Sequence, residues 1–257
     1  MNEEMVEEFV TVESIFVRER NCLALRAKFA PLYTDYYLHL MQHGLKNQEP
    51  IDSLLKELMA WFTLYMVARP WAEQHAWTVN LKNPVTANLF VTGSSLTESV
   101  VGRAFVEDVR VPKENTLYAA LLRKNQEPRN SVINIPGSDT ISWVEEFYKQ
   151  SEQRSARCFE LDDECFVMIT AQPDADEEWL SQLDAKQVEK LQETENTRVL
   201  ETRKFRFNCG CTLERIMPTL KTLQKKGDDL FRGEKSIEIT CPRCAAVYHV
   251  TPEQLDR

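Results

Sequence analysis

Cys209-Gly210-Cys211 and Cys241-Pro242-Arg243-Cys244 are the two stretches that decide how the end of this chain folds. They hold four of the seven cysteines, and twenty-nine residues separate them. Residues i and i+2 of an extended chain share a face, and Pro242 presets a tight turn between the second pair. Four thiolates that meet at one point favour zinc. The sequence therefore predicts one Zn²⁺ per chain, bound by Cys209, Cys211, Cys241 and Cys244, with free thiols or a disulfide pair as the alternative.

The composition limits where such a protein works. The chain begins Met1-Asn2-Glu3-Glu4, which is acidic where a secretory signal has a basic region. Its longest apolar run, Leu58 to Ala68, is too short to span a bilayer. We therefore expect a cytoplasmic protein, in which thiols stay reduced and metal binding is their ordinary use.

The charge of the chain is unevenly distributed. The formal net charge is -9, which disfavours nucleic acid and anionic membranes as partners. Residues 172–201 carry nine acidic and three basic residues and no glycine. We expect this acidic segment to link two domains, with the run at 174–178 forming a solvated helix start. Trp179, Leu180 and Leu183 form one helical stripe that can pack on the N-terminal part.

The remaining pattern predicts an α+β fold with three parts. These are an N-terminal mixed sheet-and-helix domain over 1–173, an acidic helical linker over 174–204 and a small four-cysteine zinc module over 205–257. Residues 51–68 predict a buried helix with Asp52 and Ser53 as cap candidates, and residues 140–152 predict an amphipathic helix. Apolar-polar alternation and turn residues predict strands over 9–18, 77–82, 86–92, 99–106, 129–135, 157–161 and 164–171.

These residues carry a resemblance to a known family. The chain resembles the 33 kDa heat-shock proteins, redox-regulated zinc chaperones whose sequences end in C-x-C, a spacer of similar length and C-x2-C. The four cysteines match that pattern. Further similar stretches are Phe207, Leu213-Glu214-Arg215, Leu220-Lys221-Thr222-Leu223, Tyr248, Tyr148-Lys149-Gln150-Ser151-Glu152-Gln153, Thr78-Val79-Asn80-Leu81 and Val101-Gly102-Arg103-Ala104. The chain departs from the family in having Ala245 where a glycine usually follows the last cysteine, few glycines elsewhere and a shorter linker.

The resemblance implies an ATP-independent holdase chaperone that binds unfolded or aggregating proteins. In such a protein, oxidation converts Cys209, Cys211, Cys241 and Cys244 to disulfides and releases zinc, and the active form can be a homodimer. The residues are compatible with this switch. A module of about fifty residues is near the size at which an apolar core alone becomes marginal, so its fold depends on the metal. Zinc-bound thiolates also remain oxidisable.

The main alternative is a zinc ribbon in which the four-cysteine site is purely structural and serves a nucleic-acid or protein interaction. A C-x-C first pair is unusual for a ribbon, and no stripe of arginine and aromatic residues flanks the site. An enzyme is not expected, because no phosphate-binding loop and no catalytic constellation is present.

The other cysteines and the histidines have simpler interpretations. His39 and His43 have the i, i+4 spacing of a metal pair, but no third ligand is evident, and we interpret them as helix-surface residues. Cys22, Cys158 and Cys165 are expected to be small buried apolar residues. His249 follows Cys244 closely enough to replace a thiolate, which remains an alternative.

Overall fold

A ten-stranded sheet dominates the computed structural model, which describes residues 9–70, 73–123, 125–225 and 230–255. The strand order is β7-β6-β3-β4-β5-β10-β1-β2-β9-β8. The strands are β1 (Val10–Val17), β2 (Cys22–Lys28), β3 (Glu73–Leu81), β4 (Ala87–Ser94), β5 (Ser99–Phe105), β6 (Thr116–Arg123), β7 (Arg129–Asn134), β8 (Ala156–Leu161), β9 (Cys165–Ala171) and β10 (Thr197–Phe207). Neighbouring strands are antiparallel except β10 and β5, which are parallel and share only two residue pairs. The sheet therefore consists of two five-stranded halves joined at the end of β10.

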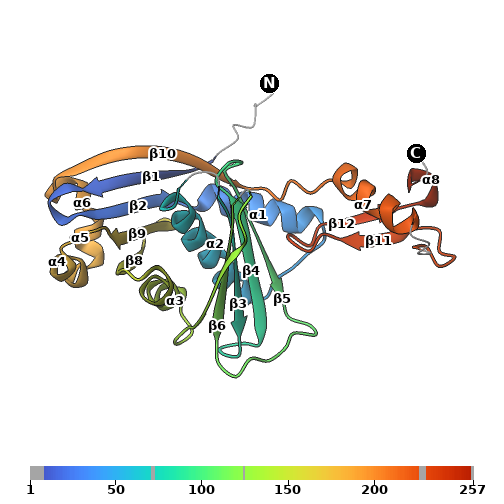
Figure 1. Cartoon of the computed structure of the whole chain (residues 1–257), viewed down its shortest axis with the longest axis horizontal. Coiled ribbons are helices and arrows are strands. Elements are labelled where there is room, and N and C mark those ends of the chain that lie inside the picture. The colour runs from blue at the N-terminus through green and yellow to red at the C-terminus, as the bar shows by residue number, and fades with distance from the viewer. Residues whose placement is uncertain (1–8, 71–72, 124, 226–229, 256–257) are drawn as a thin grey trace.

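The helices lie around and between these halves. They are α1 (Ala30–Gln42), α2 (Ile51–Val67), α3 (Thr140–Phe147), α4 (Glu177–Gln182), α5 (Ala185–Glu189), α6 (Leu191–Thr194), α7 (Leu213–Lys225) and α8 (Pro252–Leu255), with short turns at η1 (Arg18–Arg20) and η2 (Tyr148–Glu152). A separate two-stranded sheet pairs β11 (Ile237–Thr240) with β12 (Val247–Val250). Figure 1 shows α2 between the two halves of the large sheet, α4–α6 at one end of the long axis and β11, β12, α7 and α8 at the other.

Helix α2 organises the main core. Fourteen of its seventeen residues are buried, as expected for a helix that is apolar on nearly every face. It packs on strands from both halves of the sheet, including β4, β5 and β9. A Cβ atom on Gly93 of β4 would lie 2.6 Å from the Cε atom of Met66 on α2 and 2.7 Å from the backbone carbonyl oxygen of Ser99, which cannot move aside as a side chain can. Glycine at position 93 is therefore required by packing.

The predicted α+β class is confirmed, and so are the main elements. The buried helix, the helix that begins at Thr140 and all seven predicted strands are present with small shifts at their ends. Five strands were not predicted: β2, β6 and β10 of the large sheet, and β11 and β12 of the small one. Strand β10 contains residues 197–204, which we expected in a helical linker. Its N-terminal half has no clear alternation, and its pairing partner β1 lies about 190 positions earlier, so only tertiary contacts reveal it.

One predicted helix cap is wrong. Helix α2 begins at Ile51 after Pro50, so Asp52 lies inside the first turn and does not cap it. Its carboxylate instead accepts hydrogen bonds of 2.7 Å from the hydroxyl groups of both Tyr36 and Tyr37. Asp52 therefore joins α1 to α2, a contact that outweighs the local preference for a cap.

The acidic segment packs on the sheet as its apolar stripe predicts. Leu180, Leu183, Val188 and Leu191 are buried in a second core with residues of β1, β2, β8 and β9, and Trp179 packs against its edge. Asp176 caps α4, which confirms a helix start within the acidic run. Asp184 caps α5 through a capping box with Gln187. Apart from this packing, the predicted division into 1–173, 174–204 and 205–257 stays a prediction.

None of the helices in the described part of the chain is both long and apolar enough to cross a membrane.

Candidate metal centre

Strand β10 carries the first cysteine pair to the site. Phe205 and Phe207 are buried in the main core, and the backbone N–H of Asn208 donates to the carbonyl of Val100 at 3.0 Å. The chain leaves the sheet at this point. Gly210 between the two cysteines has a φ of +62°, a conformation that glycine adopts without strain. The first cysteine pair is thus fixed directly to the end of the central sheet.

The second pair lies in the turn between β11 and β12. The N–H of Cys241 donates to the carbonyl of Ala246 at 2.8 Å, and the N–H of Ala245 donates to the carbonyl of Cys241 at 3.0 Å. This turn requires a φ of +62° at Ala245, where the resemblance leads one to expect glycine. A Cβ atom is strained in this region by roughly 1–2 kcal/mol. The turn between Cys241 and Ala246 therefore contains a strained backbone conformation at Ala245.

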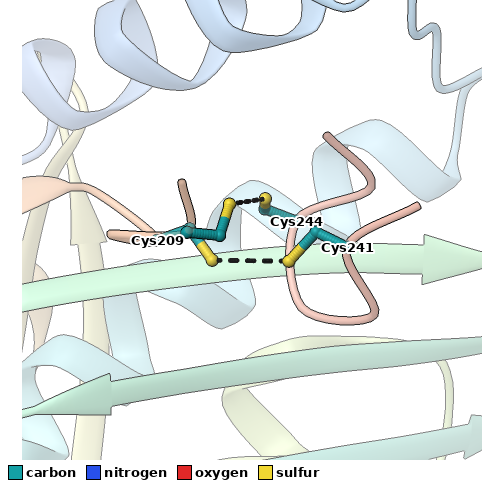
Figure 2. A group of neighbouring side chains, drawn as sticks. Cys209, Cys241 and Cys244 are labelled. Carbon is teal, nitrogen blue, oxygen red and sulfur yellow. Dashed lines mark hydrogen bonds between the residues drawn. The ribbon is translucent and has the colours of Figure 1, made fainter. Parts of the chain in front are cut away.

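The four sulfur atoms meet at one point. Cys209, Cys211, Cys241 and Cys244 each offer one sulfur, and all four lie within 4.8 Å of one another. The Cys209 and Cys241 sulfurs are 3.7 Å apart, and those of Cys211 and Cys244 are 3.4 Å apart. Figure 2 shows the side chains of Cys209 and Cys241 pointing toward each other. Cys241 and Cys244 are buried, and the first pair is partly buried. The predicted clustering is confirmed, and such a group can hold a metal ion.

The electrostatics of the thiols depend on one another. Hydrogen bonding with Cys244 lowers the pKa of Cys209 to about 5, although burial opposes the shift. The same interaction raises the pKa of Cys244, and burial raises the pKa of Cys211 to about 11. One thiolate is therefore stabilised by its neighbours, while further thiolates are disfavoured by their proximity to the first. A cation at the centre of the cluster would stabilise several thiolates at once, because its positive charge offsets their mutual repulsion.

Side chains of Tyr248, Arg103 and His39 form hydrogen bonds with backbone or sulfur atoms of the cysteines. The Tyr248 hydroxyl lies 2.8 Å from the carbonyl of Cys211 and 3.2 Å from its sulfur. Arg103 on β5 donates to the carbonyl of Cys241 at 2.9 Å. His39 on α1 lies with its Nε2 atom 2.8 Å from the carbonyl oxygen of Cys244. The last two contacts fasten the cysteine turn to the N-terminal part.

The interpretation of His39 as an ordinary surface residue is wrong. It is half-buried, and its ring packs 5.2 Å from the ring of Phe207 as well as bonding to Cys244. His43 lies one turn later and is also half-buried, and desolvation lowers its pKa. The i, i+4 spacing was the available sequence signal. Arg103 lies in a stretch that carries the family resemblance, but no local pattern indicates its contact with Cys241, which joins positions 138 residues apart.

The other predicted residues lie outside the cluster. Cys22, Cys158 and Cys165 are all buried with at most 4 % of their surface exposed, as predicted. Burial raises the pKa of Cys158 strongly and that of Cys22 to about 11, which keeps both thiols protonated. His249 is exposed on β12, opposite Glu238, and is not part of the sulfur cluster.

Sequence comparisons place the C-terminal part of the chain among known proteins. A family model described as "Hsp33 protein" matches residues 160–251. A 33 kDa chaperonin from Picosynechococcus sp. is 43% identical over 58 residues, and one from Agathobacter rectalis is 36% identical over 58 residues. Each alignment covers 22% of this chain and spans only a fifth of the relative's length, 20% in both cases.

A solved structure extends the similarity to the whole fold. The 33 kDa chaperonin of Thermotoga maritima, a heat shock protein 33 homologue, superposes with a TM-score of 0.68. The match covers 97% of both chains at 14% sequence identity, so it shows a shared fold. The family model and the curated relatives therefore relate the C-terminal part of the chain to the Hsp33 family, and the solved structure shows that the whole chain shares the fold of an Hsp33 homologue.

Proposed function

We propose that this protein is a cytoplasmic, ATP-independent holdase chaperone that is activated by oxidation. In the reduced state, Cys209, Cys211, Cys241 and Cys244 bind one Zn²⁺. Oxidation of these thiolates releases the ion, and the protein then binds unfolded or aggregating clients. The observation that carries the proposal is the position of the sulfur cluster, at the end of β10 and against the main core.

The sulfur geometry fits zinc. A regular tetrahedron with Zn–S bonds of about 2.3 Å has edges of about 3.8 Å. The sulfur separations of 3.7 Å between Cys209 and Cys241 and 3.4 Å between Cys211 and Cys244 are close to that edge length. Thiolate ligands with no oxygen donor among them exclude magnesium and calcium on chemical grounds. Zinc supplies the positive charge that holds four thiolates together, and Tyr248 can donate its hydroxyl proton to the sulfur of Cys211.

The metal matters for the fold of the C-terminal module, residues 205–257. Among the described residues of the module, its separate apolar cluster contains three buried residues, Leu220, Val250 and Leu255, with partly buried apolar side chains packed around them. Structural zinc contributes on the order of 10–16 kcal/mol to folding in small peptide modules. Loss of the ion should therefore unfold most of this module, since three buried side chains cannot compensate for its ordering entropy.

The redox step is balanced by two molecules of a peroxide. Each oxidises two thiolates to one disulfide and is itself reduced, so four electrons leave the cluster as two disulfides form. We expect Cys209 to pair with Cys211 and Cys241 with Cys244, because each pair is adjacent in the chain. A sulfur–sulfur bond of about 2.05 Å is incompatible with the shared centre of a metal site, so oxidation and zinc binding are mutually exclusive.

We propose that strand β10 transmits the unfolding of the C-terminal module to the rest of the protein. Figure 1 shows it running from the helices of the acidic segment to the cysteine module. Its end is held to β5 by two residue pairs, Arg206 with Ser99 and Phe207 with Val100. Unfolding of the module would free this end and loosen the strand and the acidic segment before it. The edge of β1 that pairs with β10, and apolar side chains of both cores, would then be exposed and could bind clients.

Aggregation suppression tests the proposal. A chemically unfolded client is diluted into reduced, zinc-loaded protein or into protein oxidised with peroxide under mild heat, and light scattering and zinc release are followed together. We expect suppression only after oxidation, with zinc release and disulfides confined to the four cysteines. Cys241→Ser should lose zinc, whereas Cys165→Ser should retain it as the matched buried control.

Several outcomes would overturn parts of the proposal. Equal suppression by reduced and oxidised protein removes the redox switch. A disulfide at Cys158 or Cys165 that forms before zinc is lost contradicts the assignment of the redox thiols. High-affinity nucleic-acid binding at physiological salt, without holdase activity, would favour the purely structural zinc ribbon.

A further inference from the structure

Helix α1 ends with two histidines one turn apart, beside the cysteine cluster. The ring centroids of His39 and His43 lie 4.7 Å apart at an interplanar angle of 52°. Both rings border a hollow of about 340 Å³ that is also lined by Cys209, Cys211 and Tyr248. The cysteines already account for the sulfur site, but the histidine pair has no role in it beyond the bond from His39 to Cys244.

The bond to Cys244 decides which nitrogen of His39 can bind a metal. A backbone carbonyl only accepts hydrogen bonds, so the Nε2 atom of His39 carries a proton and donates it to Cys244 at 2.8 Å. In the neutral imidazole the Nδ1 atom then has the free lone pair. Metal-bound histidines ordinarily donate their second ring N–H to a carbonyl or carboxylate in this way. The hydrogen bond to Cys244 thus leaves Nδ1 as the nitrogen of His39 that can bind a metal.

The spacing of the two rings also fits a shared ion. With metal–nitrogen bonds of about 2.0–2.1 Å, two imidazoles at 90–109° around one ion have centroids roughly 4.5–5.2 Å apart. The observed 4.7 Å lies within that range. The i, i+4 spacing on one helix face keeps the rings in this arrangement without help from another element.

We propose that His39 and His43 form a second divalent-metal site for a borderline ion such as Zn²⁺ or Ni²⁺. Imidazole nitrogen prefers these ions over magnesium and calcium. The two rings are the protein ligands, and the hollow leaves room for water at the remaining positions. The site is separate from the sulfur cluster, although the two share the Cys244 carbonyl contact. A metal on Nδ1 makes the Nε2–H a stronger donor, so loading this site should strengthen that contact.

Zinc titration of the reduced full-length protein tests the second site. The protein is first loaded with one equivalent of Zn²⁺, and further Zn²⁺ is added in a calorimeter. We expect a second, weaker binding event in the wild type, and a loss of affinity of at least tenfold in His43→Gln. The variant changes His43 because a change at His39 would also remove the contact with Cys244.

The matched control is His249→Gln, which removes an exposed histidine of the C-terminal module and should leave both binding events unchanged. Zinc in the sulfur site is measured separately, as the fraction released only after a mercurial blocks the thiols. His43→Gln should retain this fraction. The proposal is overturned if the wild type shows no second event, if His43→Gln binds the second ion as tightly, or if His249→Gln loses it. A missing mercurial-dependent fraction would instead count against the four-cysteine site.

Discussion

The Nε2 atom of His39 lies 2.8 Å from the carbonyl oxygen of Cys244, across 205 positions of the chain. Together with the bond from Arg103 to the carbonyl of Cys241, it fastens the turn that carries the second cysteine pair to α1 and β5. Cys241, Cys244 and Ala246 are accordingly part of the main core cluster. The cysteine cluster therefore packs on the N-terminal part of the protein, and its stability should respond to changes there.

Arg103→Met should weaken zinc binding although Arg103 is not a ligand. Hydrogen bonds from charged donors contribute about 1.5–3 kcal/mol, and loss of half of that from the folded module corresponds to an affinity loss of about three- to tenfold. Competition with a chromophoric chelator measures the change. Arg110→Met, at an exposed position before β6, is the control and should bind zinc normally. Equal affinity in the two variants would mean that docking does not support the site.

Ala245→Gly should stabilise the cysteine turn. The φ of +62° at Ala245 strains an alanine by roughly 1–2 kcal/mol, and the larger entropy of glycine in the unfolded chain offsets about 0.4–1 kcal/mol of the gain. A net stabilisation of up to about 1.5 kcal/mol should appear as slower zinc release to a chelator. Ala246→Gly is the control, because Ala246 is buried and has no such φ, and it should release zinc faster.

Leu180→Ala should loosen the acidic segment in the reduced protein. Leu180 is 1 % exposed in the second core, and truncating a buried leucine destabilises by about 2–5 kcal/mol. Under the proposed function, the variant should suppress aggregation without oxidation and be cleaved faster by protease within residues 177–194. Leu200→Ala removes the same atoms at an exposed position of β10 and should behave as the wild type. Rapid cleavage without holdase activity would show that release of this segment is insufficient.

His75 should make the fold less stable in mild acid. Desolvation lowers its pKa from 6.5 to about 4, against the attraction of Glu73 and with added repulsion from Arg69 and Arg123. The unfolded chain therefore binds the proton more readily between these values. The contribution of His75 to the free energy of unfolding is fully present above pH 6.5 and is lost as the pH falls toward 4. Between pH 7 and pH 5 the loss is about 2 kcal/mol.

Urea unfolding at pH 7 and pH 5 measures the effect of His75. His75→Gln removes the titrating group, so its unfolding free energy should fall less over this interval than that of the wild type. Protonation of the cysteine site occurs in both proteins and cancels in the difference. An equal fall in the two proteins would show that another group causes the acid sensitivity.

Local patterns predicted much of the fold. The seven predicted strands follow from alternation and turn residues, and α2 follows from an apolar run with helical length. The wrong cap at Asp52 and the missed β10 have a common cause. In both, a distant partner outweighs the local preference: Tyr36 and Tyr37 bind the Asp52 carboxylate, and β1 and β5 flank β10.

The sequence by itself determined the four sulfur donors. Cysteine type and the C-x-C and C-x2-C spacings are local, so their chemistry is visible before folding, as is the burial of Cys158 and Cys165 within apolar strands. Only the tertiary structure decided which residues of the N-terminal part contact the cysteine cluster. The contacts of His39 and Arg103 join residues more than 130 positions apart, and their strength depends on burial and on distances that no local pattern encodes. The same holds for β10, whose place between β1 and β5 links the acidic segment to the cysteine cluster.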